Sequence, residues 1–181
     1  MEELSSELET PLLFMSYYNI AFSNGIGEFV KSAKQAGAEG LIIPDVPPEE
    51  SNDGFFSACE EADLPLIPLV SPLTSKERIK LITDKFSADS FVYCVSTTGT
   101  TGVRDSLPDG LPEYLERVKK QSALPRAVGF GISKAAHLEQ LSGLAEIAVC
   151  GSAIVNMAAE AFEKSEDPAA AVSSFVRNLL S

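Results

Sequence analysis

Two short glycine turns near the end of the sequence have the composition of an anion-binding site. Gly129, Phe130 and Gly131 follow one short apolar run, and Gly151 and Ser152 follow the next. Glycine lets the backbone approach an anion closely, and the free N–H groups and dipole at a helix N-terminus attract negative charge. One such turn indicates little, because glycine is common in turns. Two of them after consecutive runs predict a phosphate site.

A longer candidate loop precedes these turns. Residues 96–110, STTGTTGVRDSLPDG, are rich in glycine and hydroxyl side chains. Loops of this length in compact domains are often lids that close over an active site. An ordinary solvated surface loop has the same composition, so the residues leave both interpretations open.

Other candidate side chains follow other apolar runs. Asp45 follows the second run, where a catalytic or positioning carboxylate could lie, although fixing a turn is the slightly favoured interpretation. Tyr17, Tyr18 and Tyr93 could line the pocket of an aromatic ligand, but buried tyrosines more often belong to a core. These residues therefore stay candidates.

Composition limits the classes of function. The chain has 181 residues, enough for one domain, and 26 acidic against 14 basic residues give a net charge of −12. This balance argues against binding nucleic acid or an anionic membrane surface. The start, MEELSSELET, is neither a secretory signal nor a transit peptide. Three cysteines, far apart and odd in number, indicate no disulfide framework or metal site and a reducing, cytoplasmic setting.

Short apolar runs alternate with amphipathic segments along the whole chain. We expect strands at residues 11–16, 40–44, 66–70, 90–95, 126–129 and 146–150. We expect helices at 26–36, 51–61, 76–86, 111–121, 134–141 and 168–180. Thr74 with Glu77 is spaced as a capping box, Ser133 can cap the fifth helix, and Asp167 before Pro168 can start the last one.

This alternation predicts an α/β fold with a parallel sheet. The chain is about two βα units shorter than a usual (β/α)8 barrel, which takes ~250 residues, and an open doubly wound sheet is the alternative. We expect residues 1–10 to be an acidic, unstructured leader and residues 11–181 to be a single domain.

Several of these segments together resemble the tryptophan synthase α subunit family. The resemblance covers nearly everything from about Thr10 onward, in order and with family-like spacing. It rests on PLLFMSYYN at 11–19, NGIGEFV at 24–30, AGAEGLIIPDVPPEE at 36–50, FVYCVSTTGTTG at 91–102, AVGFGIS at 127–133 and VCGSAIV at 149–155.

The resemblance implies a (β/α)8 TIM barrel, here an incomplete one with about six βα units. It implies aldol-type cleavage of indole-3-glycerol phosphate to indole and glyceraldehyde 3-phosphate, without a cofactor in this chain. Indole would then pass to a β subunit that carries pyridoxal phosphate. The implied substrate and phosphate residues are Tyr93, Thr101, Gly102, Gly129, Phe130, Gly131, Gly151 and Ser152. The implied face for the β subunit contains Tyr17, Asn19, Asp45 and Pro47.

The family's catalytic glutamate and aspartate have no match in this sequence and are expected on the N-terminal side of Met1. Three hypotheses follow. The chain is part of a complete enzyme of the family, or it is a non-catalytic module that binds a phosphorylated ligand and modulates a β-type partner. In the third and weakest hypothesis it is another phosphate-handling barrel enzyme that uses Asp45.

Overall fold

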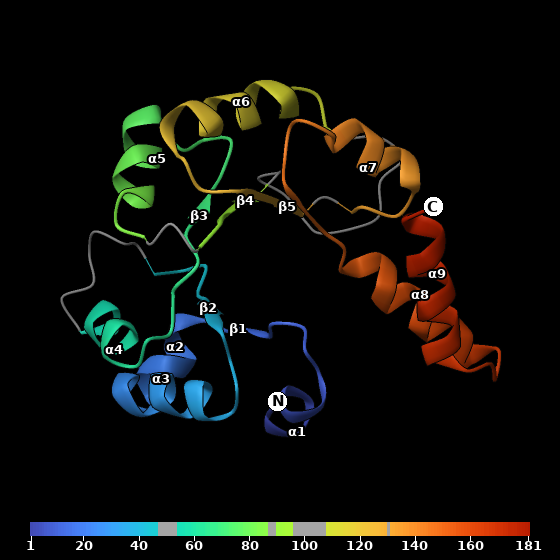
Figure 1. Cartoon of the computed structure of the whole chain (residues 1–181), viewed down its shortest axis with the longest axis horizontal. Coiled ribbons are helices and arrows are strands. Elements are labelled where there is room, and N and C mark those ends of the chain that lie inside the picture. Colours follow the sequence, from blue (N-terminus) through green and yellow to red (C-terminus); the bar gives the residue numbers. More distant parts are fainter. Residues whose placement is uncertain (47–53, 87–89, 96–107, 130) are drawn as a thin grey trace. The chain divides into compact units, whose positions relative to one another are not determined.

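The computed structural model describes residues 1–46, 54–86, 90–95, 108–129 and 131–181 (Figure 1). The chain divides into two compact units. The first comprises Met1–Leu69 and Lys80–Val92, and the second comprises Val70–Ile79 and Tyr93–Ser181. The division therefore passes through β3 (Leu69–Val70), α5 (Lys76–Thr83) and β4 (Val92–Val95).

The first unit is built on a pair of parallel strands. Its elements are α1 (Glu2–Glu7), β1 (Leu13–Met15), α2 (Tyr18–Ser23), α3 (Ile26–Gln35), β2 (Gly40–Ile42) and α4 (Phe55–Glu61). Leu13 pairs with Gly40, and Leu41 forms a further parallel bridge with Leu66. Helices α2, α3 and α4 lie together on one side of the two strands (Figure 1). Val30, Leu41 and Phe55 form the buried centre of this packing.

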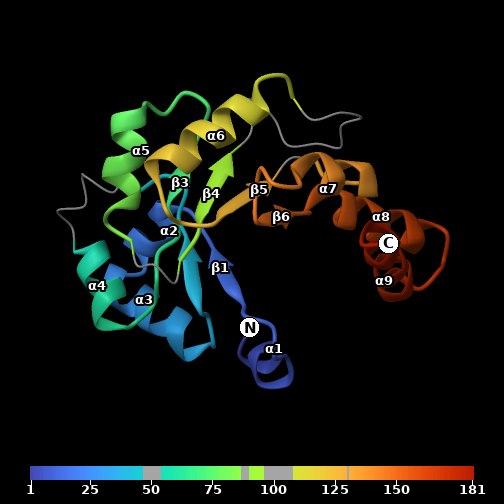
Figure 2. The same cartoon turned by 45° about the horizontal axis from the view of Figure 1, so that its top comes forward.

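The second unit contains most of a four-stranded sheet with the order β3–β4–β5–β6. Its further elements are α6 (Leu111–Gln121), β5 (Arg126–Gly129), α7 (Ala135–Leu141), β6 (Ile147–Val149), α8 (Ser152–Glu163) and α9 (Pro168–Leu179). Strands β5 and β6 are parallel. Helices α8 and α9 lie side by side, as Figures 1 and 2 both show.

The expected alternation of helices and parallel strands is confirmed, and each of the six expected strands contains an observed one. Helix α6 and strand β5 have the expected bounds. Helix α6 buries Leu111, Tyr114, Leu115 and Val118, as its apolar spacing predicts. Asp167 caps α9 by accepting a hydrogen bond from the N–H of Ala169 at 2.9 Å.

Three local expectations are wrong. The leader is not unstructured, because residues Glu2–Glu7 form α1 and the Ser5 hydroxyl donates to the carbonyl of Ala36 at 3.3 Å. Ser75, not Thr74, accepts the N–H of Arg78 at the start of α5, while Thr74 Oγ1 accepts the N–H of Ser71. The third is the cap of α7, where no side chain caps the helix and the N-cap residue is Lys134 rather than Ser133.

None of the helices in the described ranges is long and apolar enough to cross a membrane.

Candidate functional site

The pairing of β5 with β6 brings the two glycine turns together. Gly129 is the last residue of β5 and pairs with Val149, the last residue of β6. Both turns therefore leave the sheet at the same level, at the carboxyl ends of adjacent parallel strands. Ligands of parallel α/β proteins gather at this end of the sheet. The expectation that the two turns are neighbours is confirmed.

An ion pair at the opposite end of these strands fixes their register. The Glu146 carboxylate, just before β6, accepts hydrogen bonds from the backbone N–H of Arg126 at 2.7 Å and from its Nε at 3.1 Å. Arg126 Nη2 donates to the second carboxylate oxygen. Only 5% of the Arg126 side chain is exposed, so its charge is satisfied by Glu146 rather than by water. These hydrogen bonds lower the pKa of Glu146.

A thiol joins the two turns directly. Cys150 Sγ donates a hydrogen bond to the carbonyl of Ile132 at 3.0 Å. Ile132 is buried, which holds the end of the first turn against the core. Gly131, between β5 and Ile132, has a φ of +67°, a conformation that favours glycine over residues with a Cβ. The path of the first turn therefore depends on both Gly131 and Cys150.

The second turn opens onto the N-terminus of α8. Gly151 is the N-cap residue, and its carbonyl accepts the N–H groups of Ile154 at 2.9 Å and Val155 at 3.1 Å. A Cβ built on Gly151 would meet no atom of the described chain within 4 Å. Gly151 therefore has open space beside its Cα among the described residues, at a helix end whose dipole favours an anion. Ser152 is the first residue of the helix and is partly buried.

Tyr93 lies across the end of β5. A Cβ on Gly129 would overlap the Tyr93 hydroxyl oxygen and lie 3.2 Å from its Cζ. Glycine at this position therefore makes room for the tyrosine ring. Burial raises the pKa of Tyr93, so the phenol stays protonated near neutral pH and can both donate and accept a hydrogen bond. Tyr93, Gly129 and the two turns all belong to the second unit.

The residues expected on the partner face lie in the first unit. Tyr17 is the N-cap residue of α2 and 65% exposed, and Asn19 is an exposed residue of the same helix. Asp45 Oδ1 accepts the N–H of Tyr18 at 2.8 Å, so the loop after β2 is fastened to the start of α2. The structure thus brings Tyr17, Asn19 and Asp45 together and gives the Asp45 carboxylate a capping contact.

Four expected site residues lie outside the described residues. They are Pro47, Thr101, Gly102 and Phe130. Their assignments remain predictions.

One residue of the site was not expected to contribute. The sequence alone does not indicate this contact of Cys150, because a lone cysteine in an apolar run is usually a small core side chain. Its position directly before Gly151, at the end of a strand, is the available signal. Among the described residues, no group of three or more His, Cys, Asp or Glu side chains could hold a metal ion.

Comparisons with known proteins agree on one family. The family model "Tryptophan synthase alpha chain" matches residues 1–180. The tryptophan synthase alpha chain of Methanocaldococcus jannaschii is 47% identical over 81% of this chain and 51% of its own length. That of Thermoanaerobacter sp. (strain X514) is 43% identical over 99% of this chain and 66% of its own length. The chain thus spans about half to two thirds of these relatives.

Solved structures give the same result. A mutant tryptophan synthase alpha-subunit from Pyrococcus furiosus superposes with a TM-score of 0.85 at 31% identity, covering 99% of this chain and 70% of that one. The alpha chain from Legionella pneumophila gives 0.83 at 32% identity, covering 98% and 64%. The α/β architecture with parallel strands is that of these TIM barrels.

Proposed function

Because the chain belongs to the tryptophan synthase alpha chain family, we propose that it binds indole-3-glycerol phosphate for aldol-type cleavage to indole and glyceraldehyde 3-phosphate. The observation that carries this proposal is the pair of glycine turns, held side by side at the carboxyl ends of β5 and β6, with open space at Gly151. This is where barrels commonly bind phosphate.

The cleavage breaks the bond between C3 of the indole ring and the glycerol chain. C3 gains a proton, and the neighbouring glycerol hydroxyl loses one as its carbon becomes the aldehyde of glyceraldehyde 3-phosphate. We assign binding and orientation to the residues described above. The phosphate would lie against the N–H groups of the turn at Gly131 and at the start of α8.

Tyr93 would contact the organic part of the substrate. Its ring lies beside the Gly129 end of the first turn, so a substrate anchored by its phosphate would extend past it. A protonated phenol can hydrogen-bond a glycerol hydroxyl without placing a second negative charge near the phosphate. Tyr93 therefore acts as an orienting group in this proposal.

We further propose that the surface around Tyr17, Asn19 and Asp45 meets a tryptophan synthase β subunit, which would carry the pyridoxal phosphate. The exposure of Tyr17 supports this proposal, since large exposed aromatic side chains are typical of protein interfaces. This chain would need no cofactor of its own. Its three cysteines are free, which is consistent with the cytoplasm as its compartment.

Glycerol 3-phosphate binding, measured by calorimetry with inorganic phosphate as competitor, tests the anion site. Gly151→Asp would place a carboxylate where the phosphate binds. Two unit charges 4 Å apart near a protein surface repel by about 4 kcal/mol, and solvent reduces this, so we expect at least about tenfold weaker binding. The open space around Gly151 and its φ of −121° should let the variant fold.

Gly27→Asp is the matched control. Gly27 lies in the first turn of α3, and a Cβ there also meets no atom within 4 Å. The control adds the same charge in similar surroundings and should leave the affinity unchanged. Unchanged affinity in folded Gly151→Asp would overturn the proposed site.

A further inference from the structure

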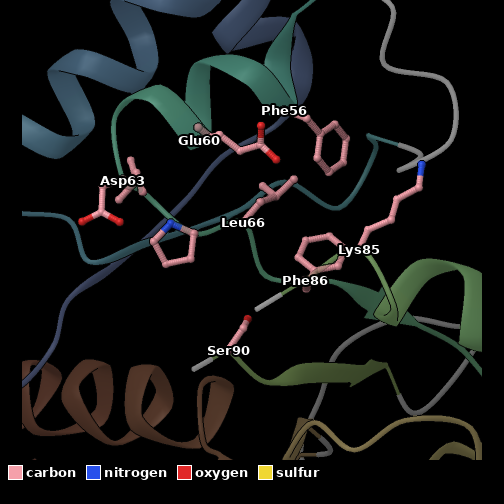
Figure 3. A pocket seen from close by; sticks show the side chains of 10 residues that line it. Phe56, Glu60, Asp63, Leu66, Lys85, Phe86 and Ser90 are labelled. Atoms are coloured by element: carbon pink, nitrogen blue, oxygen red, sulfur yellow. The ribbon is translucent and has the colours of Figure 1, made fainter. Parts of the chain in front are cut away.

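A cavity of about 450 Å³ lies in the first unit, and none of the glycine-turn residues lines it (Figure 3). Its walls come from α4, from the segment that leads to β3, and from Lys85, Phe86 and Ser90, which follow α5 and precede β4. It therefore lies at the amino ends of β3 and β4, whereas the turns leave the carboxyl ends of β5 and β6. Its volume is within the range of small-molecule sites, roughly 300–1,000 Å³.

The floor of this cavity is apolar and aromatic. The rings of Phe56 and Phe86 face each other edge to face, with centroids 6.1 Å apart and planes at 67°. Leu64 and Leu66 are buried beside them. Figure 3 shows Leu66 between the two rings. Two aromatic rings and two leucines give a surface that suits a further flat ring.

One carboxylate faces this apolar floor. Figure 3 shows the Glu60 carboxylate beside the Phe56 ring. Glu60 directly follows Cys59 of the cavity wall, where burial and then the Glu60 charge raise the thiol pKa to about 12. Asp63 points away from the rings and forms an ion pair with Lys34, with 3.7 Å between Oδ2 and Nζ.

Lys85 is the third charged side chain of the lining. Figure 3 shows the Lys85 ammonium group on the opposite side of the Phe56 ring from the Glu60 carboxylate. On its side of the Phe56 ring, Glu60 therefore offers a negative charge to a molecule seated on the rings. The net charge of −12 adds a field that favours cations over anions.

We propose that this cavity binds a small arylalkylamine, with its ring against the surface formed by Phe56 and Phe86 and its ammonium group on Glu60. A ring alone would leave the Glu60 carboxylate unused, and a carboxylate ligand would be repelled by it. This site takes a cation at the amino ends of the strands, so it is independent of the phosphate site proposed above.

Calorimetry with 2-phenylethylamine and 3-phenylpropanoate tests the proposal. The two probes share a ring and a two-carbon linker but carry opposite charges. We expect the amine to bind at least about tenfold more tightly, because a charge-assisted hydrogen bond at a partly exposed site supplies a preference of that order. Equal affinities, or no binding of the amine, would overturn the proposal.

Glu60→Gln and Glu61→Gln form a matched pair of variants. Both remove one charge from the exposed surface of α4, but only Glu60 lines the cavity. Glu60→Gln should weaken amine binding about tenfold, and Glu61→Gln should change it less than about twofold. Equal losses in both variants would mean that only the overall charge attracts the amine, and the proposal would fail.

Methyl NMR locates the amine without any variant. The methyl resonances of Leu64 and Leu66 should shift on adding 2-phenylethylamine, while those of Val128 beside the turns should not. Shifts at Val128 alone would place the amine elsewhere and refute the proposal. Glycerol 3-phosphate should bind equally well in the presence of saturating amine, so either proposal can fail while the other stands.

Discussion

Replacing Gly129 by alanine tests how closely Tyr93 is fitted to the end of β5. The new Cβ would overlap the Tyr93 hydroxyl oxygen and lie 3.2 Å from Cζ. Carbon atoms in contact are normally about 3.5–4.0 Å apart, so the ring must move. Crowding of this kind in a packed site costs about 1–3 kcal/mol. We expect Gly129→Ala to lower the free energy of unfolding by about that amount.

Tyr93→Phe should rescue the alanine variant. The phenylalanine ring lacks the overlapping oxygen and retains only the 3.2 Å contact, which a small shift relieves. Alone, Tyr93→Phe should cost no more than about 1 kcal/mol, the typical value of one hydrogen bond. The double variant should be nearly as stable as Tyr93→Phe, so the coupling energy should be close to the cost of Gly129→Ala alone, about 1–3 kcal/mol.

Urea unfolding, followed by circular dichroism, measures all four proteins of this cycle. Gly151→Ala is the control, because a Cβ at Gly151 meets no described atom within 4 Å and should change stability little. If Gly129→Ala unfolds like the wild type, Tyr93 moves freely and is not fitted to the strand. If Tyr93→Phe fails to restore stability, the crowding lies elsewhere and the reasoning is refuted.

Three further predictions concern stability and activity. Glu146→Gln should destabilise the protein at pH 7 by about 1–2 kcal/mol, less than for a fully buried pair because 48% of the Glu146 side chain is exposed. The pKa of Glu146 in the folded protein lies below its ordinary value of 4.5, so its contribution to stability is complete above about pH 5 and is lost as the pH falls through the folded pKa. The stability of Glu146→Gln should therefore fall less steeply on acidification than that of the wild type. Denaturant unfolding at several pH values measures this difference. Ser165→Gly should stabilise the protein by about 0.5–1 kcal/mol, because Ser165, just after α8, has a φ of +58°, which favours glycine. Ser174→Gly, within α9, should destabilise the protein by a similar amount in the same unfolding assay. A polypeptide of residues 1–181 assayed alone should release no indole from indole-3-glycerol phosphate. Adding a segment that carries the family's two carboxylates should restore indole release. Indole release by the polypeptide alone would point to Asp45 as the catalytic carboxylate instead.

Local patterns in the sequence predicted the elements well where the signal lies within one helix or strand. The four apolar residues of α6 recur at helical spacing and are all buried. At the start of α5 the sequence does not specify which residue caps the helix, because the adjacent residues Thr74 and Ser75 both carry hydroxyl groups. The structure uses Thr74 for the preceding turn and Ser75 for the helix.

Contacts between distant residues could not be predicted in this way. Asp45 reaches the N–H of Tyr18 across 27 positions, and Cys150 reaches the carbonyl of Ile132 across 18. Both contacts exist only because the flanking strands pair in one register. The glycine turns could be assigned to a common site because the rule for parallel strands supplies that register in advance. The fit between Tyr93 and Gly129 depends on side-chain positions, which no spacing rule specifies.

The two units are built from alternating segments of the sequence, which affects how they can fold while the chain is being synthesised. The segment Val70–Ile79 belongs to the second unit but precedes Lys80–Val92, which completes the first. A ribosome that releases the chain from its N-terminus must therefore extrude Val92 before the first unit has all its residues. During that interval Val70–Ile79 is already outside the ribosome, while its partners from Tyr93 onward have not yet emerged. Its buried residues Val70 and Ile79 are then exposed, which makes this short segment a natural point of contact for chaperones.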